Sequence, residues 1–216
     1  TNDLYDARDL LVDELNEYLP VSIERVPSGG MASEVAEGSL TITYQGKVLV
    51  EGQYAGTITV NDSNNPAAPI DGAIDGDAYS PFGMLSINPA AVPGKTDESY
   101  TADNFDYTDL NSHNSRGKLL ALIDAYGYST TDADVVKGIY PEMLADLNKL
   151  AETFVAVFNG AHTKGFTLGT DATPSRNGVN FFDPNGKTAK TIKVNDEVIQ
   201  NPNLVAASTR QGEEGN

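Results

Sequence analysis

Residues 141–162 carry the feature that most limits how this chain can fold, an apolar repeat at helical spacing. Six apolar side chains follow one another at alternating intervals of three and four residues: Leu144, Leu147, Ala151, Phe154, Phe158 and Ala161. Such a repeat is typical of a helix that packs lengthwise on another helix at a crossing angle of about 20°. Pro141 suits the first turn, because proline lacks an N–H that a first turn leaves unbonded anyway. The sequence therefore predicts a long helix with one continuous packing face.

A second helix is predicted near the N-terminus, over residues 3–19. Leu4, Ala7, Leu11, Leu15 and Tyr18 share one face of it. Pro20 ends it, because the residue before a proline is pushed towards an extended conformation. The two helices can pack on each other or on a neighbouring subunit, and packing within one molecule is favoured. The predicted helix-packing residues are Leu4, Leu11, Leu15, Leu144, Leu147, Ala151, Phe154 and Phe158.

Between the helices the pattern changes. Short alternating runs cut by glycines indicate antiparallel hairpins over residues 21–60, with one turn at Gln45-Gly46. Residues 61–112 are rich in Asp, Asn, Pro, Gly and Ser, which favours a surface excursion or a small irregular subdomain, with one strand candidate at 84–89. The expected fold class is α+β, with long antiparallel helices forming a shaft and small antiparallel β excursions between and after them.

The corresponding domain prediction has three parts. Residues 1–20 and 113–165 form a helical shaft domain, which includes a helix candidate at 115–126. Residues 21–112 form a β-hairpin and irregular excursion inserted between the helices. Residues 166–216 form a strand- and turn-rich segment that either completes this domain or starts a second β domain.

Charge and composition exclude several classes of partner and site. The 14 Lys and Arg residues against 31 Asp and Glu residues give a formal net charge of −17. A chain this acidic lacks the cations that neutralise phosphates, so nucleic acid and membrane surfaces are not expected partners. The absence of cysteine rules out disulfides, thiolate metal sites and cysteine nucleophiles. No apolar run reaches the roughly 18 residues of a membrane-spanning helix, and no basic–apolar signal sequence is present.

No catalytic constellation is recognisable in the sequence. Motifs of zinc proteases, serine hydrolases and phosphate-binding loops are missing, and His113 and His162 have no carboxylates at ligand spacing. Asp71, Asp75 and Asp77 offer oxygen ligands that suit Ca²⁺, but a pair of Asp-Gly turns explains them better. We therefore expect no catalytic residue, no cofactor and no metal. A carboxylate-dependent hydrolase would need two acids in a cleft, roughly 5–10 Å apart.

Several sequence blocks are shared with one known family. Residues 2–15 resemble the pattern N-D-L-x-D-x-R-D-x-L-L-x-x-L, and residues 46–52 resemble G-x-x-L-V-x-G. Asn159, His162 and Gly165 match N-x-x-H-x-x-G. Further similar blocks are Ser115–Leu119 with Leu122, Phe181–Phe182, Ile192–Val194 and Ala206–Ser208. Taken in order, these blocks resemble the flagellar hook-associated protein 1 family, the hook–filament junction proteins of bacterial flagella.

The resemblance implies a structural protein without an active site, which joins hook to filament by self-assembly into a ring. It implies export through the flagellar channel, without a Sec signal, to an extracellular place on the flagellum. The implied partners are copies of the chain itself, the hook, a second junction protein, and an export chaperone that binds a terminus missing here. The chain would be a central fragment lacking both termini, and it would be monomeric because the terminal assembly segments are absent.

A surface adhesin or similar binding module is the alternative function. Its ligand would contact the acidic excursion at 61–112 through a set of aromatic residues, namely Tyr79, Phe82, Tyr100, Phe105 and Tyr107. The same aromatic residues are explained more simply as anchors that hold the segment to its own body. A glycan array would separate the two interpretations.

Overall fold

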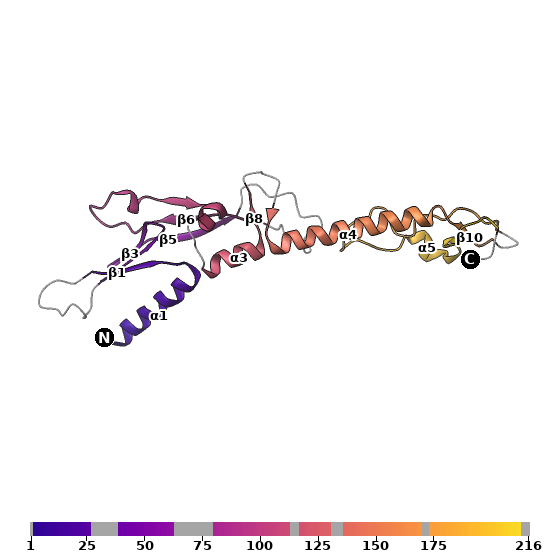
Figure 1. The fold of residues 1–216 in the computed structure, drawn as a ribbon. Coiled ribbons are helices and arrows are strands. Elements are labelled where there is room, and N and C mark those ends of the chain that lie inside the picture. The colour runs from indigo at the N-terminus through magenta and orange to yellow at the C-terminus, as the bar shows by residue number, and fades with distance from the viewer. Residues whose placement is uncertain are drawn as a thin grey trace, which may run out of the picture. The chain divides into compact units, whose positions relative to one another are not determined.

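The computed structural model describes residues 2–26, 39–62, 80–112, 117–130, 136–169 and 173–212. These residues form two compact units, unit 1 up to Pro141 and unit 2 from Glu142 onward. Figure 1 shows their helices and strands. The longest helix, α4 (Ile139–His162), starts at the end of unit 1 and lies almost entirely in unit 2. The domain boundaries expected from the sequence stay a prediction.

The first sheet of unit 1 is an antiparallel meander of four strands. In spatial order they are β1 (Ser22–Val26), β2 (Ser39–Tyr44), β3 (Lys47–Glu51) and β4 (Tyr54–Ala55). Gln45 and Gly46 connect β2 to β3, and both have a positive φ, as a two-residue hairpin turn requires. The hairpin predicted at Gln45-Gly46 is therefore confirmed.

The second sheet of unit 1 is centred on β6. Its strands are β5 (Thr57–Asp62), β6 (Phe82–Asn88), β7 (Asp103–Phe105), β8 (Tyr128–Ser129) and β9 (Val136–Lys137). β6 pairs with β5 on one side and with β7 and β8 on the other. Leu85 and Ile87 on β6 are 0% exposed and form the middle of the core. The strand candidate at 84–89 corresponds to β6, but this strand fills the interior, so the surface excursion predicted over 61–112 is wrong for it.

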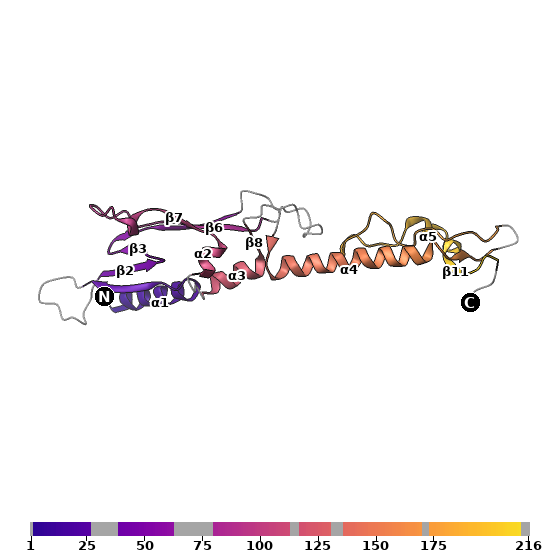
Figure 2. The same ribbon diagram turned by 45° about the horizontal axis from the view of Figure 1, so that its top comes forward.

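Three helices cover the sheets of unit 1: α1 (Asn2–Tyr18), α2 (Tyr107–Ser112) and α3 (Lys118–Tyr126). Val12 of α1 packs against Leu40 and Ile42 of β2. Figure 2 shows α1 lying along one face of this sheet. α3 begins beside the end of α1, where a Cβ on Gly117 would lie 2.0 Å from the carbonyl oxygen of Tyr18. This close approach explains why glycine stands immediately before α3.

Unit 2 consists of α4 and a mostly irregular chain that runs along it (Figure 1). Its short elements are β10 (Phe166–Thr167), α5 (Asp196–Gln200), the 3₁₀ turn Pro202–Leu204 and β11 (Ala206–Ser208). β10 and β11 pair antiparallel. The chain between them is held by isolated β-bridges, turns and side-chain hydrogen bonds.

The predicted shaft of long antiparallel helices is wrong. Of the five α-helices in the described part of the chain, α2 and α5 have only six and five residues, and sheets organise unit 1. Helix α1 packs on β2 and α3, while α4 packs on the irregular chain of its own unit. The class is mixed α+β with a large sheet content, and its sheets form a core rather than excursions from a helical rod.

Candidate functional site

One face of α4 is buried against the irregular chain of unit 2. Its buried residues, Ala151, Val155, Asn159 and His162, recur every three or four positions and so share one side of the helix. Asn159 makes two hydrogen bonds to the backbone of Phe182: its Nδ2 donates to the carbonyl, and its Oδ1 accepts from the amide, each at 2.9 Å. These two hydrogen bonds fix how closely the chain around Phe182 packs against α4.

His162 makes a second double link near the end of α4. Its Nε2 accepts a hydrogen bond from the Ala206 amide at 2.9 Å, so the ring proton lies on Nδ1, which donates to the carbonyl of Val179. The ring is 7% exposed and packs against Phe158 and Phe181. His162 is thus a structural residue whose two nitrogens are both occupied by backbone groups.

Four phenylalanines, two on α4 and two on the irregular chain, pack together between these polar links. Phe158 lies 5.0 Å from Phe181 and 5.2 Å from Phe182, and Phe154 lies 5.3 Å from Phe182, all measured between ring centroids. The tilted and edge-on geometries are those that aromatic pairs prefer. The cluster is packed on its inner side only, since Phe154 is 48% and Phe158 39% exposed.

The adjacent face of α4 is apolar and exposed. It carries six large side chains at spacings of three and four residues: Ile139, Met143, Leu147, Leu150, Phe154 and Val157. Leu150 and Val157 are 67% and 68% exposed. At 1.5 Å per residue, this apolar face extends for roughly 27 Å along the helix. A row of this length is much more than the scattered apolar residues of an ordinary surface.

The structure places the eight predicted packing residues in different environments. Ala151 is buried, and Leu15 and Leu144 are partly buried. The other five are exposed, namely Leu4, Leu11, Leu147, Phe154 and Phe158. Asn159 and His162 stand in the family motif N-x-x-H-x-x-G but were not among the predicted packing residues, because a search for apolar periodicity does not count polar side chains. Packing of the exposed residues on another helix stays a prediction.

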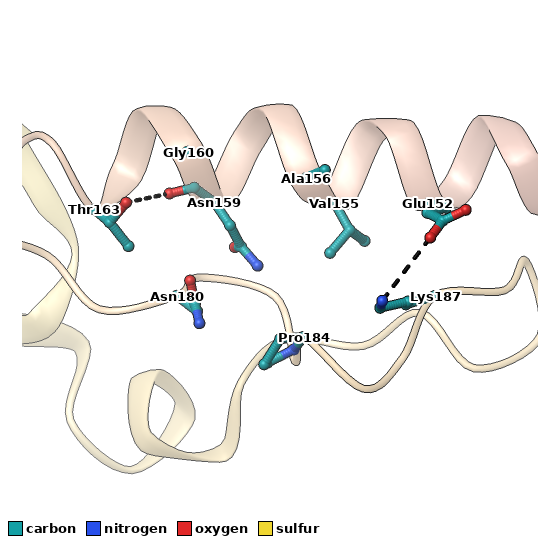
Figure 3. A pocket seen from close by; sticks show the side chains of 9 residues that line it. All are labelled: Glu152, Val155, Ala156, Asn159, Gly160, Thr163, Asn180, Pro184 and Lys187. Carbon is teal, nitrogen blue, oxygen red and sulfur yellow. Dashed lines mark hydrogen bonds and ion pairs between the residues drawn. The ribbon is translucent and has the colours of Figure 1, made fainter.

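A pocket of about 340 Å³ lies beside the buried face of α4, and Figure 3 shows its lining. Glu152 and Lys187 face each other across it as an ion pair at 3.9 Å. The Thr163 hydroxyl at one end is bonded to the carbonyl of Asn159. This single exposed ion pair and a few amide groups form no catalytic arrangement of nucleophile, base and orienting group.

Ionisable groups of unit 2 stabilise turns. The Asn185 amide donates to the Asp183 carboxylate at 2.9 Å, and Lys193 approaches it at 3.4 Å. These contacts, the amide first, lower the pKa of Asp183 below its ordinary value. The pKa of Lys193 is raised, chiefly by its hydrogen bond to Asp183. Asp183 and Lys193 thus stabilise the turns of the chain that precedes α5.

In unit 1, the aromatic residues suggested as adhesin contacts hold the segment 80–112 to the body. Phe82 and Phe105 are 4% and 8% exposed, and Tyr107 stacks on Tyr128. The Tyr100 hydroxyl donates to Glu51, and this bond is the main reason why its pKa is raised to about 12. The interpretation of these four rings as anchors is therefore favoured, and Tyr79 lies outside the described residues.

A buried cation reinforces the same segment. The Lys47 ammonium donates to the carbonyl of Glu98 at 3.0 Å and lies 3.2 Å from the Asp103 carboxylate. Lys47 is 6% exposed, so these oxygens replace its water shell. It ties β3 to the chain between Glu98 and β7.

Asp71, Asp75, Asp77 and His113 lie outside the described residues. Within the described ranges, no three His, Cys, Asp or Glu side chains are grouped so that they could hold a metal ion. In that same part of the chain, no helix combines the length and the apolar character needed to cross a membrane.

The comparisons with known proteins agree with the sequence blocks. The family model of the flagellar hook-associated protein FlgK helical domain matches residues 1–182. The chain belongs to the FlgK family. This family is structural and non-enzymatic, and its members are components of the flagellum. The resemblance found in the sequence is thereby confirmed, as is the expectation that the chain is not an enzyme.

A curated member of the FlgK family shows how much of such a protein is present here. Flagellar hook-associated protein 1 of Bacillus subtilis (strain 168) is 32% identical over 205 residues, which cover 92% of this chain and 35% of the relative. The chain thus spans about a third of that relative's length. No solved structure matches the chain.

Proposed function

We propose that this chain is part of a hook–filament junction protein, which joins hook to filament by assembling side by side with its own copies into a ring. The observation that carries the proposal is the exposed apolar face of α4, from Ile139 to Val157. Membership of the FlgK family supports the flagellar context. The protein's contribution is geometric: it offers surfaces and performs no chemistry.

The arrangement of unit 2 supports this role. Asn159 and His162 fix one side of α4 to the rest of the unit, so the helix is held rigid without using its other apolar side. A rigid helix loses little conformational entropy when it docks, which favours association. We therefore propose that Leu147, Leu150 and Val157 pack against a helix of a neighbouring axial subunit, forming a helical bundle only in the assembled flagellum.

The partners follow from the same proposal. They are copies of the protein, the hook and a second junction protein at the two ends of the ring, and an export chaperone that binds a terminus outside this chain. The protein would leave the cell through the flagellar channel, without a Sec signal, and act outside the cell. In dilute solution this chain is expected to be monomeric, because the neighbouring helices are absent.

The proposal is tested in a motile bacterium whose own junction protein carries the substitution Leu150→Glu. Leu150 is 67% exposed, so the chain is expected to fold, while a carboxylate would be buried without a partner in the assembled junction. Cells should swim poorly, and electron microscopy should show hooks without filaments. Lys149→Glu is the matched control, since it adds the same side chain one position along, on the polar side of α4.

Full-length filaments in the Leu150→Glu strain would refute the role of this face. Loss of filaments in both strains would show that added negative charge, rather than the apolar face, causes the defect. Export of each variant is checked in the culture medium, so that a failure to leave the cell is not mistaken for a failure to assemble.

A further inference from the structure

The hydrogen bond between Ala206 and His162 exists only while the histidine ring is neutral. The ring nitrogen Nε2 accepts this bond from the Ala206 amide at 2.9 Å, and Nδ1 is bonded to the carbonyl of Val179. An imidazolium carries a hydrogen on both nitrogens and has no acceptor. A proton on Nε2 would therefore point at the hydrogen of the Ala206 amide, whereas the bond to Val179 would persist. Protonation thus removes one particular contact, which holds the start of β11 to the end of α4.

The surrounding backbone holds the ring and the amide face to face. A Cβ on Gly178 would lie 3.0 Å from Nδ1 of His162 and 2.9 Å from the Cβ of Ala206. A Cβ on Gly165 would also lie 2.9 Å from the Cβ of Ala206. A pocket of about 320 Å³ is lined by both His162 and Ala206, and it offers a route by which a proton from water reaches the ring.

The charged groups around the contact do not favour an imidazolium. Three residues beside the elements that enclose the ring are cations, namely Lys164, Arg176 and Arg210. Asp183 is the acidic residue that follows the segment packed on the ring, and its carboxylate already lies 3.4 Å from the Lys193 ammonium. Within α4 the nearest acidic residue is Glu152, ten positions and roughly 15 Å from His162.

We propose that the contact between His162 and Ala206 is acid-sensitive, so that protonation of the ring releases the start of β11 from α4 and loosens unit 2. A histidine in an unfolded chain takes up a proton below about pH 6.5, whereas the closed form of unit 2 requires the neutral ring. The state that binds more protons gains as the pH falls. The contribution of this contact is therefore complete above pH 6.5 and is lost below it.

Urea unfolding of the full chain between pH 7.5 and pH 5 tests the proposal, followed by the amide NMR signal of Val155, which is buried in unit 2. Relative to His162→Gln, the unfolding equilibrium constant of the natural chain should rise by up to about tenfold per pH unit below pH 6.5. Glutamine keeps one donor and one acceptor but takes up no proton. Parallel pH curves for the natural chain and His162→Gln would overturn the proposal.

The matched control is His113→Gln, which removes the other histidine of the chain and should leave the pH dependence unchanged. Loss of the dependence in His113→Gln would also contradict the assignment to His162. About 0.5 M NaCl screens the net charge of −17, which would otherwise favour protonation of any group in the folded chain. The carboxylates titrate in all three proteins, so their effect cancels in the comparison.

A direct measurement of the contact does not depend on the folding of His162→Gln. In the His113→Gln chain His162 is the remaining histidine, so its ring nitrogens can be followed by NMR alone. At pH 7.5 the ring proton should lie on Nδ1. As Nε2 gains a proton, the Ala206 amide signal should lose its hydrogen-bonded position with the same midpoint. A ring proton on Nε2 at pH 7.5, or a protonated ring beside an unchanged Ala206 signal, would overturn the proposal.

These measurements use the free chain and are independent of the apolar face of α4. Leu150→Glu should leave the pH dependence of unfolding unchanged, because Leu150 lies on the exposed side of the helix. A failure of the junction proposal is therefore distinguishable from a failure of this one.

Discussion

The amide of Ala206 and the ring of His162 are joined by a hydrogen bond of 2.9 Å between residues 44 positions apart in sequence. The Val179 carbonyl occupies the other ring nitrogen, so a single side chain ties two distant backbone segments to the end of α4. In the part of unit 2 that the structure describes, regular sheet is limited to the pair β10 and β11. Such polar links therefore have to provide much of its order.

His162→Ala should destabilise unit 2 by about 1–3 kcal/mol, because it leaves the half-buried Ala206 amide and Val179 carbonyl without their hydrogen-bond partner. Urea unfolding measures the loss, and hydrogen exchange of the Ala206 amide should accelerate. The exposed neighbour Lys164 supplies the control, since Lys164→Ala should change neither quantity appreciably. Unchanged exchange at Ala206 in the His162 variant would show that the hydrogen bond is not formed.

Val155→Asp should destabilise the chain much more than Phe154→Asp. Val155 is 4% exposed, so its replacement buries an unpaired carboxylate, at a cost of about 3 kcal/mol or more. Phe154 is 48% exposed, and its aspartate can reach water while only the ring contacts are lost. Thermal unfolding of the two variants gives the comparison. Equal losses would mean that the two faces of α4 are equally covered in the free chain.

These two neighbouring residues also show what the sequence could predict. The periodicity of residues 141–162 correctly predicts a helix there, because two apolar faces both repeat every three or four residues. It could not show which face is buried. The buried side includes Asn159 and His162, which a pattern of hydrophobicity does not register, while Leu147 and Phe154 of the predicted seam lie on the open side.

The burial of β6, within a stretch expected at the surface, has a related explanation. The polar and turn-forming residues of this stretch indicate a surface loop, and β6 supplies only a short apolar run within it. Leu85 and Ile87 are nevertheless the most buried side chains of unit 1, because strands from both sides pair with β6. Pairing between strands distant in sequence leaves no local signal, so the sheet order was not predictable from one sequence.

Gly117→Ala should weaken the junction between α1 and α3. A methyl group there would lie 2.0 Å from the Tyr18 carbonyl oxygen, and the backbone would have to move, at a cost of at least about 2 kcal/mol. Gly160→Ala is the matched control, for which the opposite change in stability is expected. No atom lies within 4 Å of its added Cβ, and alanine in a helix interior should stabilise by up to about 1 kcal/mol. Chemical denaturation of both variants checks the contrast.

Tyr100 should make stability depend on alkaline pH. Its pKa in the folded chain is raised to about 12 from 10.0, chiefly by the hydrogen bond to Glu51. A folded-state pKa above the unfolded value means that the contribution is complete below pH 10 and is lost between pH 10 and about 12. The free energy of unfolding should therefore fall more steeply over this range in the natural chain than in Tyr100→Phe. Parallel curves for the two proteins would contradict the hydrogen bond.

The most direct test of the account is the accessibility of the apolar face of α4 before and after assembly. Leu150→Cys and Lys149→Cys each place a thiol on α4, in a chain segment that has no other. In the free chain both thiols should react rapidly with a soluble maleimide. In isolated flagella that contain the full-length protein, the thiol at position 150 should be protected and the thiol at 149 should remain reactive. Equal reactivity of both thiols in the flagella would contradict the claim that this face joins neighbouring subunits.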